Sequence, residues 1–419
     1  MPCSILPIVR LACLLLMLTG SALHGQTKSE SESETELDIP NSQPLTIPMT
    51  PPKDALAMIE LPTGFSATLA ACEPQVHQPV AATFDYRGRL WVVECYTYSE
   101  RPGNFDLNLK DRVLIFEDTD NDGVFDSRKI FWDKGKQLTG IELGFGGVWL
   151  TSAPNLIFIP DRDADDQPDG DPEIMLDGFA SAKIRHNIVN GLRWGPDGWL
   201  YGRHGILETS FVGRPGSTES QRQSLNCGIW RFHPISRTFE VVAHGSTNPW
   251  GFDFDQHGEM FMINTVIGHL FHVVPGARYQ RMYGAHFNPH TYQVIPQIAD
   301  HVHWDTTKEK WNDAKKSALS DATDQAGGGH AHCGLLIYQG HNWPQEFHNK
   351  VLTANFHGRR INSEIIQRHG NGYIATHGPD YFKTQDPWFR GIELLSGPDG
   401  GVFVLDWSDI GECLSLIHI

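Results

Sequence analysis

The sequence predicts an all-β protein, a six-bladed β-propeller whose last blade is truncated. Phrases with two apolar strands around a glycine turn recur along the chain, as in "GLRWGPDGWLYGRHG" and "IELLSGPDGGVFVLD". The turn glycines Gly88, Gly146, Gly198 and Gly258 lie 52 to 60 residues apart, and the gap before Gly400 leaves room for one more unit. Repeats of this length made of short strands are typical of propellers. The 41 glycines and 12 tryptophans also suit a turn-rich β protein.

The chain begins with the pattern of a signal peptide, which we expect over residues 1–25. Arg10 precedes the apolar run "LACLLLMLTG", and small residues follow in "GSA". The run is too short to span a bilayer, so we expect no transmembrane helix. We therefore expect an exported protein, in a periplasm or outside the cell.

Residues 26–54 are acidic and proline-rich without periodicity, which predicts a disordered linker. The propeller is expected over residues 55–413. The final residues, "LSLIHI" at 414–419, read as the translation of a transposase end used to prepare sequencing libraries, and we expect a non-native tail there. The natural chain would then continue differently after residue 413, and the third strand of the sixth blade would be missing.

Each unit is expected to form four strands in up-and-down order. The second strands are expected at "RLWVVE", "GVWLTS", "WLYGRH", "EMFMIN", "KVLTAN" and "GVFVLD". The segment "GFSATLAA", from Gly64, is expected to be the outermost strand of the sixth blade, closing the ring. The loops that enter each first strand and the loops that leave each second strand lie on one face in this order. A pocket on the axis at that face is the expected site.

Charge and cysteine content narrow the possible partners. The net charge of −17 argues against a nucleic-acid partner. There is no C-x-x-C-H sequence, so no haem is expected to be attached covalently to this chain. An odd number of cysteines follows the predicted signal peptide, so at least one is unpaired: Cys72, Cys95, Cys227, Cys333 and Cys413.

Two kinds of metal site are suggested by the residues. Asp118, Asp120, Asp122 and Asp126 in "DTDNDGVFD" have a spacing that could surround a structural Ca²⁺, with Gly123 permitting the turn. A solvated aspartate turn is the competing interpretation.

Thirteen histidines also occur between residues 269 and 377, including "HVHWD" and "GGGHAHCG". Imidazole suits transition metals, so a histidine-ligated metal site is an alternative to loop packing.

From Leu61 to Cys413 the chain resembles the soluble quinoprotein dehydrogenases of the glucose and sorbosone dehydrogenase family. The resemblance is carried by "LPTGFSATLAACEP", "TNPWGFDF", "CGLLIYQGHNWPQEFHNKVLTANFHG" and "FRGIELLSGPDGGVFVLD", in this order. The chain is similar in particular to a planctomycete-type branch, the membrane-bound dehydrogenase domain. The resemblance implies a six-bladed propeller that oxidises a sugar or alcohol with pyrroloquinoline quinone (PQQ). It also implies a cytochrome c domain or protein as electron acceptor.

The resemblance assigns roles to five residues. His186 in "KIRHNIVNGLRW" stands where the family has the histidine that takes the substrate proton, which suits a group titrating near neutrality. Arg390 in "PWFRGIEL" matches an arginine that binds the quinone carboxylates. Arg203 and His204 are expected to border the same pocket, and the family's quinone-binding lysine falls near His357.

Two further family arginines are replaced here, by Trp388 and Thr247. Three functions therefore remain open: a quinone-dependent dehydrogenase, a non-catalytic propeller that binds carbohydrate or protein, and a histidine-ligated metalloenzyme. His186 and Arg390 favour the first, the missing arginines favour the second, and the dense histidines favour the third.

Overall fold

A computed structural model describes residues 8–12, 47–98, 104–265, 268–282, 284–286, 288, 290–308 and 320–410 of the chain, with the backbone alone for residues 8–12. The predicted tail, and most of the predicted signal peptide and linker, lie outside these residues. The described part contains two short helices, α1 (Pro52–Ala57) and α2 (Asp321–Gln325), and is otherwise built of strands and loops. The predicted all-β fold is confirmed.

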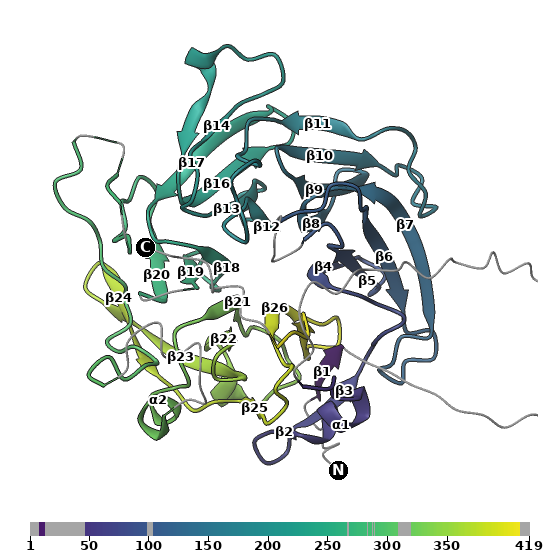
Figure 1. Ribbon diagram of the computed structural model, residues 1–419, viewed down its shortest axis with the longest axis vertical. Helices are drawn as coiled ribbons and strands as arrows, with labels where there is room; N and C mark the ends of the chain where they lie inside the picture. The colour runs from purple at the N-terminus through teal and green to yellow at the C-terminus, as the bar shows by residue number, and fades with distance from the viewer. Residues whose placement is uncertain are drawn as a thin grey trace, which may run out of the picture.

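Sheets of three or more strands surround a common axis in the described part of the chain, and we number them 1 to 6 in chain order (Figure 1). Sheet 1 consists of β4 (Pro79–Phe84), β5 (Leu90–Glu94), β6 (Asp111–Glu117) and β7 (Ser127–Gly135). Sheet 2 consists of β8 (Leu138–Leu143), β9 (Gly147–Ser152), β10 (Asn155–Pro160) and β11 (Glu173–Leu176). Sheet 3 consists of β12 (Asn190–Trp194), β13 (Leu200–His204), β16 (Gly228–His233) and β17 (Thr238–His244).

The remaining sheets depart more from four strands in order. Sheet 4 has three strands, β18 (Pro249–Phe254), β19 (Met260–Asn264) and β20 (Leu270–Val273). Sheet 5 contains β21 (His332–Ile337), β22 (Val351–Asn355), β23 (Arg360–His369), β24 (Gly372–His377), β25 (Phe382–Thr384) and β2 (Ile59–Glu60). Sheet 6 contains β26 (Gly391–Ser396), β27 (Val402–Asp406), β1 (Ile8–Ala12) and β3 (Ser66–Leu69). A hairpin of β14 (Ser210–Val212) and β15 (Gln223–Leu225) projects beside sheet 3 (Figure 1).

The innermost strand of every sheet carries an irregularity at the same place. The register between first and second strand shifts near the start of β4, β8, β12, β18, β21 and β26. A β-bulge bends its strand and re-aims one side chain. In each sheet, the bulge therefore changes the direction in which one residue of the inner strand points.

Glycine at this place lets neighbouring sheets approach closely. A Cβ on Gly140 would lie 2.8 Å from the backbone nitrogen of Gly191, and one on Gly251 would lie 2.5 Å from that of Leu335. Any side chain at either position would push two inner strands apart.

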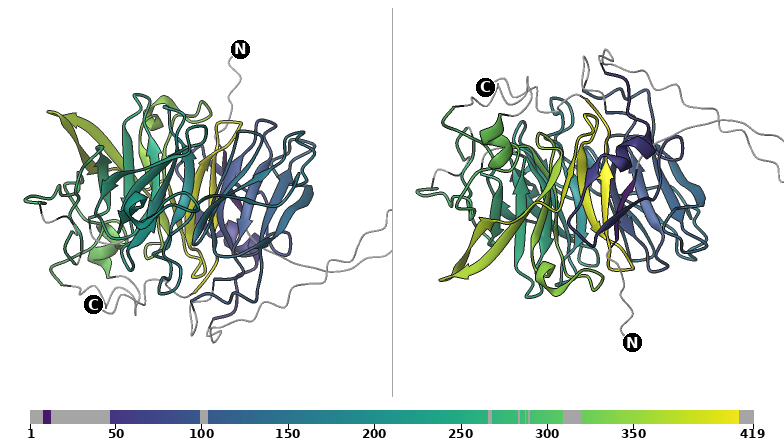
Figure 2. Two further views of the ribbon diagram at one scale, coloured as in Figure 1. Left: turned by 90° about the horizontal axis from the view of Figure 1, so that it is seen from above. Right: turned by 90° about the horizontal axis from the view of Figure 1, so that it is seen from below.

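Sheet 6 joins the two ends of the described chain, as the side views show (Figure 2). β3 occupies the outer edge of this sheet, which confirms the predicted closing strand. The sequence predicts that the third strand of this sheet is missing. In the structure β1 takes that position, and its backbone pairs in parallel with both β27 and β3.

A second connection links residues 48–60 to residues 382–388. β2 pairs with β25, Thr50 Oγ1 donates to Asp386 Oδ1 at 2.7 Å, and Trp388 Nε1 donates to the Pro48 carbonyl at 2.9 Å. We call these contacts the clasp. Trp388 thus has a structural role at the position where the resembled family has an arginine.

Among the described helices, none has the length and apolar character that crossing a membrane requires.

Candidate functional site

A cavity of about 60 Å³ lies on the axis, and every sheet contributes to its wall. Most of the lining is aromatic or aliphatic. The residues are Val80, Cys95, Tyr98, Phe105, Thr139, His186, Ile188, Asn248, Trp250, Thr265, Cys333, Phe356, Arg390, Ile392, Trp407 and Asp409. They lie at the starts of first strands, in the loops that enter first strands, or in the loops that leave second strands. This is the face where the sequence places the site. We call this space the axial cavity.

The repeated bulges build part of this cavity. Val80, Thr139, Trp250 and Ile392 each lie at the register shift of their inner strand, and each lines the axial cavity. At the equivalent place sheets 3 and 5 carry glycines, which leave space. The cavity therefore follows from the same irregularity repeated around the ring.

His186 and Arg390 both line the axial cavity, from the loops before sheets 3 and 6. Both side chains are buried, with 6% and 8% of their surface exposed. The Arg390 guanidinium donates to the carbonyls of Pro387 at 3.1 Å, Phe389 at 2.7 Å and Ile410 at 3.1 Å. Much of its donor capacity is therefore used by the backbone around it.

Arg203 and His204 do not line the axial cavity, so the expectation that they border it is wrong. Successive side chains of a strand point to opposite faces. Arg203 reaches deeper along the axis, into a separate cavity of about 40 Å³ that Glu393 also lines. His204 points away from the axis, with Nδ1 2.7 Å from the Gly205 carbonyl and Nε2 2.6 Å from Ser210 Oγ. Burial lowers the pKa of His204 to about 4.

His357 is buried beside the axial cavity but does not line it; its neighbour Phe356 does. The His357 ring contacts the ring of His330, with 4.6 Å between centroids. A Cβ on Gly329 would lie 2.6 Å from the His357 Cβ, so His357 packs against the glycine-rich turn.

The first aspartate loop brings three of its four predicted ligands together. Carboxylate oxygens of Asp118, Asp120 and Asp122 lie within 4.8 Å of one another. Asp126 is occupied elsewhere: it accepts from Thr119 Oγ1 at 2.7 Å. Binding of Ca²⁺ here stays a prediction.

Three histidines and one glutamate from distant segments converge between sheets 4 and 5. His269 precedes β20, His301 and His303 lie in the long connection to β21, and Glu364 lies in β23. One ligand atom from each lies within 4.8 Å of all the others. His269, His303 and Glu364 are buried, whereas 20% of the His301 side chain is exposed. We call these four residues the histidine–glutamate centre.

The ring nitrogens of this centre point inward. His269 Nε2 and His303 Nε2 each lie 3.1 Å from Glu364 Oε1, and His301 Nε2 lies 3.3 Å from Glu364 Oε2. The Nε2 atoms of His301 and His303 are 3.1 Å apart.

The opposite ring nitrogens also have polar partners. His301 Nδ1 lies 2.9 Å from Asp300 Oδ1, and a carboxylate can only accept, so this Nδ1 carries the hydrogen. His303 Nδ1 lies 2.7 Å from His332 Nε2, which also lies 3.4 Å from Asn355 Nδ2.

The centre holds an ionised carboxylate among the imidazole rings. Burial alone would raise the pKa of Glu364, but its hydrogen bonds with the rings of His269, His301 and His303 hold it well below its ordinary value. Burial lowers the pKa of His303 to about 3, and that of His332 well below its ordinary value. Burial would lower the pKa of His301, but its hydrogen bonds with Glu364 and Asp300 raise it above the ordinary value. The centre therefore presents one negative charge and imidazole nitrogens to the space between the four residues.

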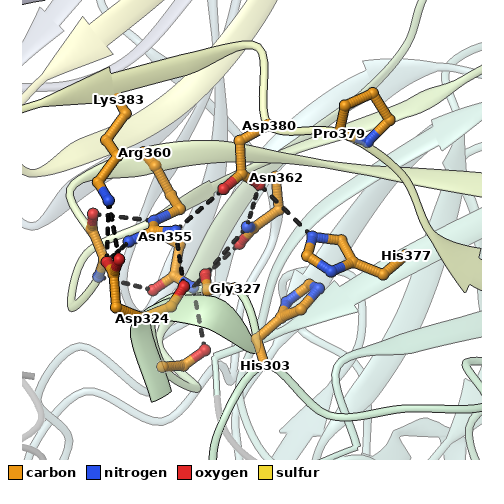
Figure 3. Close-up of polar contacts among 12 residues, drawn as sticks. His303, Asp324, Gly327, Asn355, Arg360, Asn362, His377, Pro379, Asp380 and Lys383 are labelled. Carbon is orange, nitrogen blue, oxygen red and sulfur yellow. Dashed lines mark hydrogen bonds and ion pairs between the residues drawn. The ribbon is translucent and has the colours of Figure 1, made fainter. Parts of the chain in front are cut away.

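A charged network supports this centre on one side (Figure 3). His377 packs against His303, with 4.6 Å between ring centroids, and its Nε2 lies 3.5 Å from Asp380 Oδ1. Asp380 Oδ2 accepts from Arg360 at 3.0 Å, and Arg360 also pairs with Asp324. Lys383 completes the network, with Nζ 3.0 Å from Asp324 Oδ2.

The sequence pointed to the histidine-rich region but not to the complete centre. "HVHWD" supplies His301 and His303, whereas His269 and Glu364 were not singled out because they lie far away in the chain. The residue that points to the centre is Glu364, a carboxylate in "RINSE", the segment that begins β23 and is buried throughout. A fully buried glutamate is rare unless it has a partner.

Comparisons with known proteins identify one family. A family model described as "Domain of unknown function (DUF7133)" matches residues 51–410. No curated protein matches the chain.

Similar solved structures include a putative oxidoreductase (glucose dehydrogenase) from Thermus thermophilus. It is 16% identical, with coverage of 78% of this chain and 90% of that one, and a TM-score of 0.48. A second is the PQQ-bound form of aldose sugar dehydrogenase from Streptomyces coelicolor. It is also 16% identical, with coverage of 80% and 91% and a TM-score of 0.48.

Proposed function

The chain belongs to the family described as Domain of unknown function (DUF7133), and we propose that it is a metal-dependent oxidoreductase whose metal ion is held by the histidine–glutamate centre. Its ligands would be His269, His301, His303 and Glu364. Three imidazoles and one carboxylate suit divalent transition metals such as iron, copper or zinc.

The observation that carries this proposal is the convergence of three imidazole nitrogens and one carboxylate oxygen, all within 4.8 Å of one another. The Nε2 atoms of His301 and His303 lie 3.1 Å apart and both face Glu364. His301 Nδ1 donates to Asp300, which leaves its Nε2 to face the ion when the ring is neutral. Outer carboxylate and imidazole partners of this kind orient ligand histidines in known metal sites.

A bound ion would supply a Lewis acid or a redox couple at this place. The exposed side of the centre is at His301, so a small molecule can approach from there. We propose oxidation–reduction, rather than hydrolysis, because the sequence resembles oxidoreductases.

Metal content tests the proposal directly. The full-length protein should contain close to one transition-metal ion per chain by mass spectrometry. The variants His303→Ala and Glu364→Gln should contain almost none. His257→Ala is a matched control, because His257 is an exposed histidine in the turn between β18 and β19.

Two results would contradict the proposal. One is a metal-free wild type after expression with iron, copper and zinc. The other is an equal metal content in wild type and Glu364→Gln, which would mean that the ion is bound without Glu364 and therefore not by this centre. Redox-dependent changes in the spectrum of the loaded protein would then support electron transfer over hydrolysis.

A second candidate is the exported dehydrogenase expected from the sequence, which oxidises a sugar or alcohol and passes electrons to a cytochrome c. The observation that favours it is that His186 and Arg390 line one axial cavity. In this candidate His186 accepts the hydroxyl proton, and a general base of this kind contributes about 10²–10⁴-fold to the rate. Loss of alcohol oxidation in His186→Ala, with an unchanged melting temperature, would support this candidate.

The residues of the axial cavity do not fit PQQ, whose carboxylates need cationic partners. Among the described lining residues Arg390 is the one arginine or lysine, and it is bonded to three carbonyls. The lining also includes Asp409, whose carboxylate would repel those of the quinone. Burying carboxylates without counter-charges is costly. We therefore derive no step through PQQ.

A further inference from the structure

The axial cavity offers few free hydrogen-bonding groups. Its threonine hydroxyls are already used within the protein: Thr139 Oγ1 donates to the Val189 carbonyl at 2.5 Å, and Thr265 Oγ1 to the Asn248 carbonyl at 2.9 Å. Cys95 Sγ lies 3.9 Å from Asp111 Oδ2. These groups therefore shape the wall without being left to bind a ligand.

Asn248 is different. Its side chain lines the axial cavity, only 1% of the residue is exposed, and Oδ1 has no hydrogen-bond partner in the described part of the chain. A buried amide oxygen without a partner carries a desolvation penalty that a suitable donor would remove. The backbone nitrogen of Asn248 donates to Asn264 Oδ1 at 2.6 Å, which holds the residue in place.

The walls around this acceptor are apolar. Trp250 and Ile392 come from the bulges of sheets 4 and 6, and Phe356 and Trp407 follow the second strands of sheets 5 and 6. A buried water needs two to four polar partners, which such walls supply poorly.

We propose that the axial cavity binds a small uncharged molecule of the size of a short-chain alcohol, whose hydroxyl donates to Asn248 Oδ1 while its carbon atoms contact the apolar walls. The cavity volume of about 60 Å³ corresponds to about four to six water-sized probes, which sets the size. This inference is independent of the metal centre, whose four residues do not line the cavity.

Three probe molecules with four non-hydrogen atoms each test separately whether binding depends on a hydrogen-bond donor and whether it tolerates a charge. 2-Propanol has a donor, acetone has nearly the same shape without one, and acetate carries a charge. Saturation-transfer NMR on the full-length protein should detect 2-propanol. Acetone should bind about fivefold more weakly, which corresponds to the loss of one hydrogen bond. Acetate should bind most weakly, because the cavity would bury its charge without a free cation.

Asn248→Ala should remove the preference for 2-propanol over acetone. Asn187→Ala is the matched control, because Asn187 is also a buried asparagine with unpartnered amide atoms but does not line the cavity. This variant should keep the preference.

The comparison of the three probes uses the wild-type protein alone, so it does not depend on whether a variant folds. Acetate binding as strongly as 2-propanol, no detectable alcohol binding, or a preference that survives Asn248→Ala would each overturn the proposal. Binding of 2-propanol should persist after the protein is stripped of metal with a chelator, so that failure here and failure of the metal centre are separate results.

Discussion

Arg203 and Glu393 meet across the axis of the propeller, with Nη2 of the arginine 3.3 Å from Oε2 of the glutamate. Arg203 lies on β13 of sheet 3 and Glu393 on β26 of sheet 6, so the pair links opposite sides of the ring. Both side chains are largely buried. Gly191 makes room for the guanidinium, because a Cβ there would lie 1.8 Å from Arg203 Nη2.

Arg203→Met should destabilise the protein by about 3 kcal/mol, since removing one partner of a buried pair leaves the other charge uncompensated. Urea unfolding measures the change. The double variant Arg203→Met/Glu393→Leu should recover most of the loss. A double variant no more stable than the single one would mean that the arginine acts through packing rather than through its charge.

Asp300→Ala should weaken metal binding by about tenfold or more, because it removes the acceptor that orients His301. Competition with a coloured chelator measures the affinity. Asp305→Ala is the control: it removes the same charge from the same segment, but Asp305 bonds to Thr307 instead. If the two variants bind the metal with equal affinity, Asp300 acts through its negative charge and not by orienting His301.

His204 should make stability fall as the solution becomes acidic. Its pKa is about 4 in the fold and near 6.5 in the unfolded chain, so the unfolded chain takes up the proton first. The stabilisation is complete above pH 6.5 and is lost as the pH falls towards 4.

Between pH 7 and pH 5 this residue should account for about 2 kcal/mol of lost stability. The measurement is urea unfolding of wild type and His204→Gln at both values. A variant that loses as much stability as the wild type over this range would rule out His204 as the cause.

Ca²⁺ added to metal-free protein should raise the melting temperature of the wild type but not of Asp120→Ala or Asp122→Ala. The three clustered carboxylates are the reason. A second aspartate loop, "DRDADDQPD" at residues 161–169, also brings carboxylates of Asp161, Asp163 and Asp165 together. It is expected to contribute less, because Asp166 stands where the first loop has Gly123. A Ca²⁺ response that persists in both variants would place the ion elsewhere.

Much of the fold could be predicted because its signals are local. The glycine turns mark the hairpins between inner strands, and the Gly64 segment contains the predicted closing strand β3. The loop order also places His186 and Arg390 on one cavity, since both precede an inner strand.

The side-chain directions were harder to predict. Arg203 and His204 are adjacent, yet one points to the axis and the other away from it, and a single bulged residue in β12 alters the local register. The histidine–glutamate centre depends on contacts between residues as distant as His269 and Glu364. No periodic pattern in the sequence records such a contact.

The clasp between residues 48–60 and 382–388 has a consequence for how the protein is made. Its first half leaves the ribosome early, and its second half follows only after five of the six sheets have been synthesised. Until then the nascent chain is an open arc whose terminal sheets lack their final neighbours. Unpaired strand edges and exposed apolar surface make such intermediates prone to aggregation. Late closure would therefore make this protein dependent on chaperones during its synthesis, with the demand ending when β26 and β27 follow the clasp and complete sheet 6.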